Sequence, residues 1–250
     1  DLRTFTPGAM DISSVLTDGV QLPEHSRFEL SDSWTIEMWY NTGVDNNGVL
    51  AAARALDRNL IELGVENGVP YVIMESLDSQ TTKVGGETDL LGAARPLTST
   101  FTAFNTDEWR HVAATYDSAT ELLILYVDCT ISRFAEAVGA LDAGPGETPY
   151  VYLAGDGTAV NNLDNGFLDE VRIWGSAQSL SDLNASCNGH VSSGSGIAYY
   201  RFDDGGASIE DFSNRIDLGG DGRDFVITGV STATFVLSAG TVPNNPVALY

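Results

Sequence analysis

Short apolar runs separated by turn signals recur along the chain, and this recurrence restricts the possible folds more than any other feature. The runs are rich in Val, Ile, Leu, Tyr, Phe and Trp and few exceed eight residues, which is typical of β-strands. The tripeptide ENG joins two of them and predicts a tight hairpin. The pattern predicts strands at 34–40, 59–65, 69–74, 108–117, 121–128, 150–155, 166–174, 196–203, 223–229 and 233–239.

Strands of this length and spacing predict an all-β fold, an antiparallel two-sheet β-sandwich of the jelly-roll kind. One short helix fits the run SLSDLNASCNGH, with Ser181 as its N-cap, Asp182 in its first turn and Gly189 at its end. No Pro-rich or Ser-rich linker divides the chain. We therefore expect a single domain over residues 1–240 and a C-terminal extension or linker over residues 241–250.

The charge is extreme for a chain of 250 residues, because 12 Lys and Arg face 35 Asp and Glu, a formal net charge of −23. A field of this sign repels nucleic-acid phosphates and anionic membranes and attracts cations. The sequence contains no run of 18 apolar residues, the length that a membrane-spanning helix would need. The composition argues against a nucleic-acid partner and against membrane insertion. It is compatible with solubility in a salty medium and with binding of divalent cations.

Cys129 and Cys187 are the two cysteines of the chain. In an extracellular protein such an even pair favours a disulfide, which here would close a long loop. The sequence does not show that the two Cα atoms lie close together, so two free thiols remain an alternative.

The run GFLDEVRIW places a carboxylate inside a predicted strand. Under strict alternation Asp169 shares a face with Val171 and Ile173. Glu170 and Arg172 lie on the opposite face, where they can pair. A carboxylate on an apolar face is costly unless a cation or a set of hydrogen-bond donors meets it. We therefore expect either a bound cation or backbone N–H donors at Asp169.

Three longer motifs carry a family resemblance. DEWRHVAATYDSATELLILYVD resembles the central hairpin of laminin-G-like domains of the concanavalin-A-like lectin/glucanase superfamily. GFLDEVRIWGSAQSLSDL resembles a strand and the following helix of that family, and GVQLPEHSRFELSDSWTIEMWY resembles its opening strands. The motifs follow in the family's order from about Ala9 to about Gly229. The same motifs also resemble those of pentraxins and of domains in bacterial surface proteins.

This resemblance implies a concanavalin-A-like jelly roll that acts as a secreted or cell-surface binding module. The implied partner is a glycan or a surface protein, and the implied cofactor is calcium (Ca2+). Two residues depart from the family pattern: Leu168 replaces Ile, and Cys129 replaces the usual turn Gly. The second departure favours a Cys129–Cys187 disulfide.

The resemblance also implies calcium ligands. The superfamily's Asp at the position of Asp169 helps to bind a structural calcium together with carbonyls near the N-terminal strand, and position matching adds Asp18 and Gly19. Loops of pentraxins and laminin-G-like domains hold a further calcium that bridges to ligands. Calcium takes oxygen ligands, although Asn, Asp and Gly are also ordinary turn residues. The rim-loop candidates are Asp57, Asn59, Asp156, Asn161, Asn162 and Asp164.

A catalytic pattern is incomplete in this chain. Glu62 and Glu66 occupy the outer positions of the E-x-D-x-E motif of laminarinase-type glycosidases, but Gly64 replaces the middle Asp. We expect Glu66 to open the ENG turn, and His111 to pack within the central hairpin. Because no acid–base constellation is evident, we expect a protein that is not an enzyme. A glycoside hydrolase is the less favoured alternative.

Aromatic side chains are candidates for a sugar-binding platform, because Tyr and Trp combine a large apolar face with a polar edge. The four tryptophans occupy strand positions that the family uses, so most are expected in the core. The tyrosines considered for exposed faces are Tyr150, Tyr152, Tyr199 and Tyr200.

Two short motifs have weaker implications. Asn184 begins the sequon NAS, which makes it a glycosylation candidate in a glycosylating host. GGDGRDFVI fits a single calcium-binding nonapeptide of the β-roll type. That architecture needs stacked copies, so we do not expect a site there.

The two ends of the chain resemble each other. NNPVALY at the C-terminus and GAMDI near the N-terminus both resemble the family's first strand. A chance likeness of short apolar pieces is one explanation. A second is that the chain is one unit of a tandem array, with the next copy starting at about Pro246. A third is that residues 241–250 pair with the sheet edge of another copy. Such self-association would make the protein a structural subunit of an extracellular filament or surface array, the alternative to a binding module.

Overall fold

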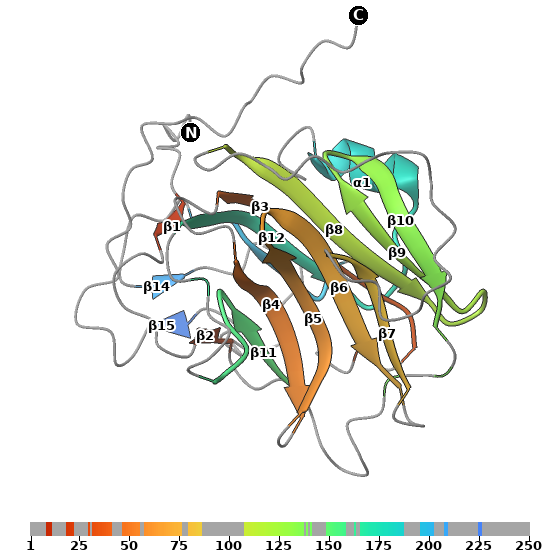
Figure 1. Cartoon of the computed structure of the whole chain (residues 1–250). Coiled ribbons are helices and arrows are strands. Elements are labelled where there is room, and N and C mark those ends of the chain that lie inside the picture. The colour runs from red at the N-terminus through yellow and green to blue at the C-terminus, as the bar shows by residue number, and fades with distance from the viewer. Residues whose placement is uncertain are drawn as a thin grey trace, which may run out of the picture.

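Two large antiparallel sheets, a separate pair of short strands and one helix make up the described part of the protein in a computed structural model (Figure 1). Residues outside this part include the predicted strand 233–239 and the extension 241–250, so the domain boundaries and the contact with a neighbouring copy stay predictions. The structure describes residues 9–11, 19–22, 30, 32–41, 47–55, 58–76, 80–86, 108–137, 139, 141, 149–158, 163, 166–187, 196–202, 208–209 and 225–226.

The larger sheet has seven strands in the order β1-β12-β3-β8-β9-β10, with β13 pairing β12 off this path. The tight turn between β9 and β10 uses Asp128 and Cys129, both with positive φ. The strands are β1 (Met10–Asp11), β3 (Trp34–Asn41), β8 (Arg110–Asp117), β9 (Leu122–Val127), β10 (Thr130–Glu136), β12 (Phe167–Trp174) and β13 (Ala198–Tyr200).

The smaller sheet has six strands in the order β2-β11-β4-β5-β6-β7. A separate pair is formed by β14 (Ser208–Ile209) and β15 (Phe225–Val226). The six strands are β2 (Val20–Gln21), β4 (Gly48–Ala55), β5 (Arg58–Glu66), β6 (Val69–Glu75), β7 (Thr81–Gly85) and β11 (Tyr150–Leu153).

One apolar core lies between the sheets and takes alternate side chains from each. Trp34, Ile36 and Met38 of β3 face this core, as do Leu63 of β5 and Val72 of β6. The prediction of an antiparallel sandwich with one short helix is confirmed. Among the described helical residues, none forms a segment long and apolar enough to cross a membrane.

Helix α1 (Leu180–Cys187) contacts the seven-stranded sheet, where Leu183 packs against Ala113 and Tyr126. Its N-cap is Ser179, not Ser181 as predicted. The backbone N–H of Asp182 donates to Ser179 Oγ at 3.2 Å, and the N–H of Ser179 donates to Asp182 Oδ2 at 3.2 Å. This reciprocal capping box fixes the start of the helix two residues earlier than expected. Gly189, the predicted end signal, lies outside the described residues.

A β-bulge in β12 changes which side chains reach the core. The register of β12 against β3 shifts after Asp169, and Glu170 has a φ of 53°. Leu168, Val171 and Ile173 all belong to the core. Asp169 therefore lies on the outer face of the sheet, and the prediction that it shares a face with Val171 and Ile173 is wrong. The extra residue of the bulge breaks the alternation on which that prediction rested.

Candidate functional site

The structure brings together two of the predicted rim-loop residues, Asn59 and Asp156. The amide nitrogen Nδ2 of Asn59 donates to Asp156 Oδ2 at 3.1 Å, although the two residues are 97 positions apart. Asp156 is only 2% exposed, and its Oδ1 accepts from the backbone N–H and the hydroxyl of Thr158 at 2.9 and 2.6 Å. The other rim-loop candidates, Asp57, Asn161, Asn162 and Asp164, lie outside the described residues.

Strand order and the bend after β11, where Ala154 has a positive φ and Gly157 lies against the Tyr152 ring, account for this proximity. β4 pairs with β5 on one side and with β11 on the other, so Asn59 at the start of β5 and Asp156 just after β11 flank β4. The β4–β5 register shifts between Ala53 and Arg54, which places Asn59 opposite Arg54 on the outer face. Ala52 of β4 has a small side chain, so longer side chains from the flanking strands can meet across that strand.

Three further residues, which the sequence did not single out together, complete this group. Arg54 Nη1 donates to Asn59 Oδ1 at 2.8 Å, and Asn59 Nδ2 also donates to Glu62 Oε2 at 2.7 Å. The hydroxyl of Tyr71 donates to Glu62 Oε1 at 2.6 Å. Each polar group thus holds its neighbour in place. We name Arg54, Asn59, Glu62, Tyr71 and Asp156 the Asn59 cluster.

The protonation of Tyr71 is fixed by its surroundings. Burial raises the pKa of its phenol far above the ordinary value, and the charge of Glu62 and the hydrogen bond to Glu62 raise it further. The phenol therefore remains a donor at physiological pH. Its ring lies against Gly64 of the neighbouring strand, where an added Cβ would come within 2.6 Å of ring atoms. A side chain at position 64 would displace the tyrosine that positions Glu62.

Glu66 does not open the hairpin turn, so that prediction is wrong. It is the last residue of β5 and pairs with Val69 across the Asn67–Gly68 turn. Its Oε2 forms an ion pair with Lys83 Nζ at 2.9 Å. The positive φ angles of Asn67 and Gly68 complete the turn, so Glu66 can remain in the ladder.

Glu62 and Glu66 share the outer face but have separate partners. Glu62 accepts hydrogen bonds from Asn59 and Tyr71, whereas Glu66 forms an ion pair with Lys83. Lys83 neutralises Glu66, and Gly64 adds no carboxylate between the two. This geometry supports the expectation that the pair is not catalytic.

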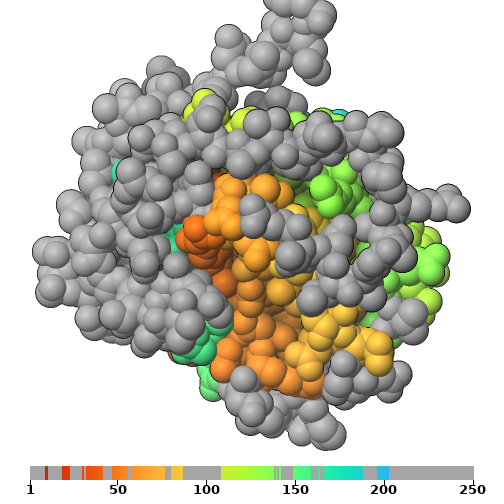
Figure 2. Space-filling model, viewed as in Figure 1, coloured from red at the N-terminus to blue at the C-terminus, as the bar shows by residue number. Residues whose placement is uncertain are grey.

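Aromatic residues also border this face. The ring of Tyr152 on β11 lies over Gly157, where an added Cβ would come within 2.7 Å of it. Tyr199 and Tyr200 are buried, so they offer no sugar platform. Figure 2 views the outer face of the six-stranded sheet and shows orange atoms of β5 and β6 reaching the surface in a hollow. On β11, Tyr150 lies opposite Arg54 and Tyr152 opposite Ala52, so these two partly buried tyrosines border the Asn59 cluster on this face.

The predicted structural calcium ligands occupy two different sheets. Asp169 lies on β12, which pairs with β1, whereas Gly19 immediately precedes β2 and lies against Gly155 beyond β11. Asp18 lies outside the described residues. The Oδ1 atom of Asp169 accepts the backbone N–H of Glu170 at 2.7 Å, so the bulge itself supplies one of the donors expected there.

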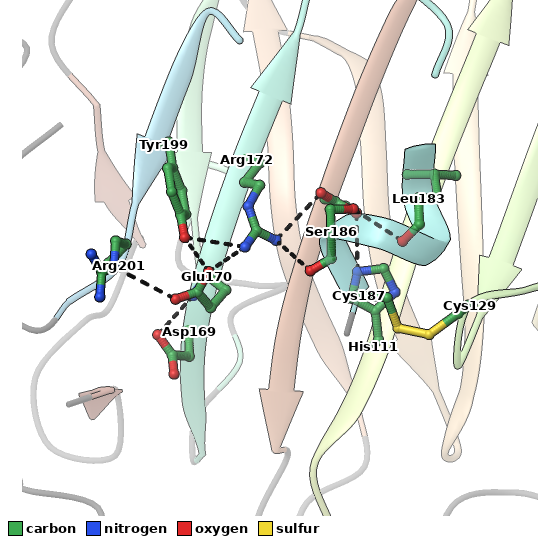
Figure 3. A network of polar contacts seen from close by, with 11 residues as sticks. His111, Cys129, Asp169, Glu170, Arg172, Leu183, Ser186, Cys187, Tyr199 and Arg201 are labelled. Atoms are coloured by element: carbon green, nitrogen blue, oxygen red, sulfur yellow. Dashed lines mark hydrogen bonds and ion pairs between the residues drawn. A yellow bond between two sulfur atoms is a disulfide. The ribbon is translucent and has the colours of Figure 1, made fainter. Parts of the chain in front are cut away.

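A second polar group is buried beneath α1 (Figure 3). Glu37 on β3 is fully buried, and its carboxylate accepts from Ser186 Oγ at 2.8 Å and from Arg172 Nη1 at 3.4 Å. Arg172 also pairs with Glu170, as the sequence predicted, and lies 4.5 Å from the ring centroid of Tyr199. We name these five residues, together with His111, the α1 network.

Charge balance holds the α1 network together. Burial alone would lower the pKa of Arg172, but Glu37, Tyr199 and Glu170 raise it above its ordinary value. The guanidinium therefore stays charged between two carboxylates. His111 is fully buried, with its Nε2 3.1 Å from Glu37 Oε2. It thus lies under α1 in a polar network and is more than a packing residue.

A disulfide joins Cys129 to Cys187, with the Cα atoms 6.0 Å apart, and confirms the expected bridge. Cys129 sits in the β9–β10 turn and Cys187 is the last residue of α1, so the bond ties the helix to the sheet edge. Asn184, the glycosylation candidate, is exposed on α1. An acceptor there is accessible to solvent.

Comparison with solved structures identifies the fold. A candidate carbohydrate-binding protein from Bacteroides ovatus superposes with a TM-score of 0.60 and 18% identity, covering 82% of this chain and 55% of that chain. A heptameric SAP-like pentraxin from Limulus polyphemus superposes with a TM-score of 0.51 and 10% identity, covering 74% and 83%. The chain thus spans about half the length of the first protein.

No curated protein matches the sequence. A family model of laminin G type, described as the concanavalin A-like lectin/glucanases superfamily, matches residues 14–184, more than half of the chain. The two sheets, their antiparallel order and the motif sequence agree with this match. The chain belongs to the laminin-G-type family of the concanavalin A-like lectin/glucanases superfamily.

Proposed function

We propose that the protein is a carbohydrate-binding module whose ligand contacts the Asn59 cluster on the outer face of the six-stranded sheet. The observation that carries this proposal is the interlocked set of Arg54, Asn59, Glu62, Tyr71 and Asp156. Sugar hydroxyls donate and accept hydrogen bonds, and this set offers carboxylate acceptors beside guanidinium and phenol donors. Fixed polar groups beside aromatic faces are what small-ligand sites use for orientation and contact.

The rigidity of the cluster supports binding. Asn59 is hydrogen-bonded through both its oxygen and its nitrogen, and Glu62 is held from two sides. A ligand that meets such preorganised groups loses less affinity to the ordering of side chains. The Bacteroides ovatus protein of the same fold is described as a candidate for carbohydrate binding, which agrees with this choice of ligand class.

Glycan binding should depend on Glu62. We expect the wild-type protein to bind at least one carbohydrate on an array of oligosaccharides and polysaccharides. The Glu62→Gln variant should bind that carbohydrate about 10–150-fold more weakly, the equivalent of one charged hydrogen bond of about 1.5–3 kcal/mol. Titration calorimetry with the carbohydrate identified on the array gives the ratio.

The matched control is Glu136→Gln on β10, an exposed carboxylate of the other sheet. This control should bind like the wild type. Equal weakening in both variants would assign the effect to overall charge, and unchanged binding in Glu62→Gln would place the ligand elsewhere. Failure of the wild-type protein to bind any arrayed carbohydrate would oppose the proposed function itself.

A structural calcium at Asp169 is a second part of the proposal. This carboxylate is only 5% exposed, and one of its oxygens already accepts from Glu170. The hard carboxylate oxygens suit calcium, and the acidic balance of the chain favours cation binding. The rim-loop alternative would use Asp156. There the Nδ2 of Asn59 occupies the space between two carboxylates, so an ion would have to displace it.

Removal of calcium should lower the melting temperature. A ligand that binds only the folded state raises the free energy of unfolding by about 2.7 kcal/mol when it is present at 100 times its dissociation constant. We expect excess EDTA to lower the melting temperature and Asp169→Asn to abolish most of that difference. Differential scanning calorimetry with and without calcium measures both. A wild-type melting temperature that EDTA does not change would contradict the proposal. If only Asp156→Asn loses the calcium-dependent difference in melting temperature, the ion binds at the rim loops instead of at Asp169.

Secretion or display on a cell surface follows from the same proposal. The disulfide and the acidic surface are typical of extracellular proteins. Adhesion to a glycan-bearing surface would then be the role of the module. Assembly into a filament through residues 241–250 remains the alternative from the sequence.

A further inference from the structure

A buried histidine lies beside the disulfide. One ligand-type atom from each of His111, Cys129 and Cys187 lies within 4.8 Å of the others. His111 is fully buried and Cys187 is 4% exposed, whereas Cys129 is partly exposed. The three residues come from β8, the β9–β10 turn and the end of α1, so the fold converges on this point.

The free nitrogen of the histidine faces the sulfur atoms. Nε2 lies 3.1 Å from Glu37 Oε2, and because a carboxylate only accepts, Nε2 carries the hydrogen. Nδ1 is then an acceptor, and it is buried without a hydrogen-bond partner among the residues that the structure describes. In Figure 3 the ring of His111 lies next to the Cys129–Cys187 bond. A buried lone pair with no donor is costly, and its place beside two sulfur atoms indicates a latent ligand.

We propose that the reduced protein binds a soft divalent metal such as Zn2+ through the sulfur atoms of Cys129 and Cys187 and the Nδ1 atom of His111. Two thiolates and one imidazole are a typical ligand set for zinc, with the fourth position left to water. Tetrahedral zinc needs sulfur atoms about 3.8 Å apart and sulfur–nitrogen separations of about 3.5 Å. The observed spread of 4.8 Å requires only small movements once the disulfide is open.

Glu37 has the position of the carboxylate that orients a metal-binding histidine. Such a partner holds the ring nitrogen that does not bind the metal and thereby fixes both tautomer and ring direction. Ser186 and Arg172 in turn hold Glu37, at 2.8 and 3.4 Å. The α1 network thus prepares His111 as a ligand, whatever the state of the cysteines.

Reduction of the disulfide and binding of the metal are two successive steps, and electrons and protons are accounted for in each. A dithiol reductant gives two electrons and two protons to the disulfide, so Cys129 and Cys187 become thiols and the reductant becomes a cyclic disulfide. Zinc then replaces the two thiol protons, which leave to solvent, and the thiolates bind the metal. The partly exposed Cys129 gives the reductant access. The site is therefore closed to metal in the oxidised protein and open in the reduced protein.

The test uses Co2+ as a spectroscopic probe and Zn2+ as a competitor. We expect the protein reduced by a phosphine to bind one Co2+, with sulfur-to-cobalt charge-transfer absorption and the visible bands of tetrahedral cobalt. The oxidised protein should show neither. Glu37→Gln should weaken Zn2+ binding by about 10–100-fold, the range found for partners of metal ligands. His111→Asn removes a ligand itself and should weaken Zn2+ binding by no less than that.

A measurement on the wild type keeps the test decisive if a variant fails to fold. X-ray absorption of the Zn2+ complex should show two sulfur neighbours with nitrogen or oxygen completing the shell. Absence of metal binding by the reduced protein would overturn the proposal. So would equal binding by the oxidised protein, by the Cys129→Ser, Cys187→Ser double variant, or by a folded His111→Asn variant.

Discussion

Replacing Arg172 with methionine should lower the free energy of unfolding by about 3–5 kcal/mol, the range for breaking a buried ion pair from one side. Arg172 is 1% exposed and contacts both Glu37 and Glu170. Without it, two carboxylates remain buried with less compensation. Methionine preserves most of the side-chain volume, so the loss reports charge and hydrogen bonding. Urea unfolding followed by circular dichroism measures the difference.

The matched control for this variant is Arg110→Met on β8. Arg110 pairs with Asp128 at 2.6 Å, but its side chain is 29% exposed. An ion pair at the surface contributes about 0–1 kcal/mol. Equal losses at positions 110 and 172 would show that the α1 network is no more important to stability than a surface pair.

The sequence predicted β3, β5, β6, β8, β9, β11 and β12 because hydrophobic runs and turn residues act locally. It did not predict β4, β7 or β10. β4 contains four alanines, a residue with low strand preference. It forms a strand because β5 and β11 supply hydrogen-bond partners on both sides, and this pairing is visible only in three dimensions.

The candidate site was predicted in part. Turn chemistry pointed to Asn59 and Asp156, and strand order together with the bend after β11 brings them into contact. Glu62 was considered only as half of a catalytic pair, whereas its contacts are with Asn59 and Tyr71. These partners are set by the register of three strands, and a single sequence does not reveal register when a bulge intervenes.

The same limit applies to Asp169. The sequence correctly singled out a carboxylate that needs partners, but it assumed strict alternation along β12. The bulge at Glu170 moves Asp169 to the outer face and supplies a backbone N–H to it. The predicted pairing of Glu170 with Arg172 is present, although Glu170 itself lies in the bulge.

The disulfide should contribute about 4 kcal/mol to stability, because it closes a loop with a sequence separation of 58 residues. The Cys129→Ser, Cys187→Ser double variant should lose this amount in urea unfolding. Cys129 has a φ of 62°, a left-handed conformation that costs a residue with a side chain about 1–2 kcal/mol. The Cys129→Gly, Cys187→Ser variant should therefore be about 1 kcal/mol more stable than the serine pair.

These two variants share the loss of the bridge and differ only in the residue at the turn, so their difference isolates the backbone strain at position 129. Reduced and alkylated wild type shows whether opening the bond has the same effect as removing both cysteines. A serine pair as stable as the oxidised wild type would contradict the stabilising role of the bond. If glycine brings no gain in stability, the left-handed conformation at position 129 is not strained. The disulfide then offsets no backbone cost at the turn where Cys129 replaces the family's glycine.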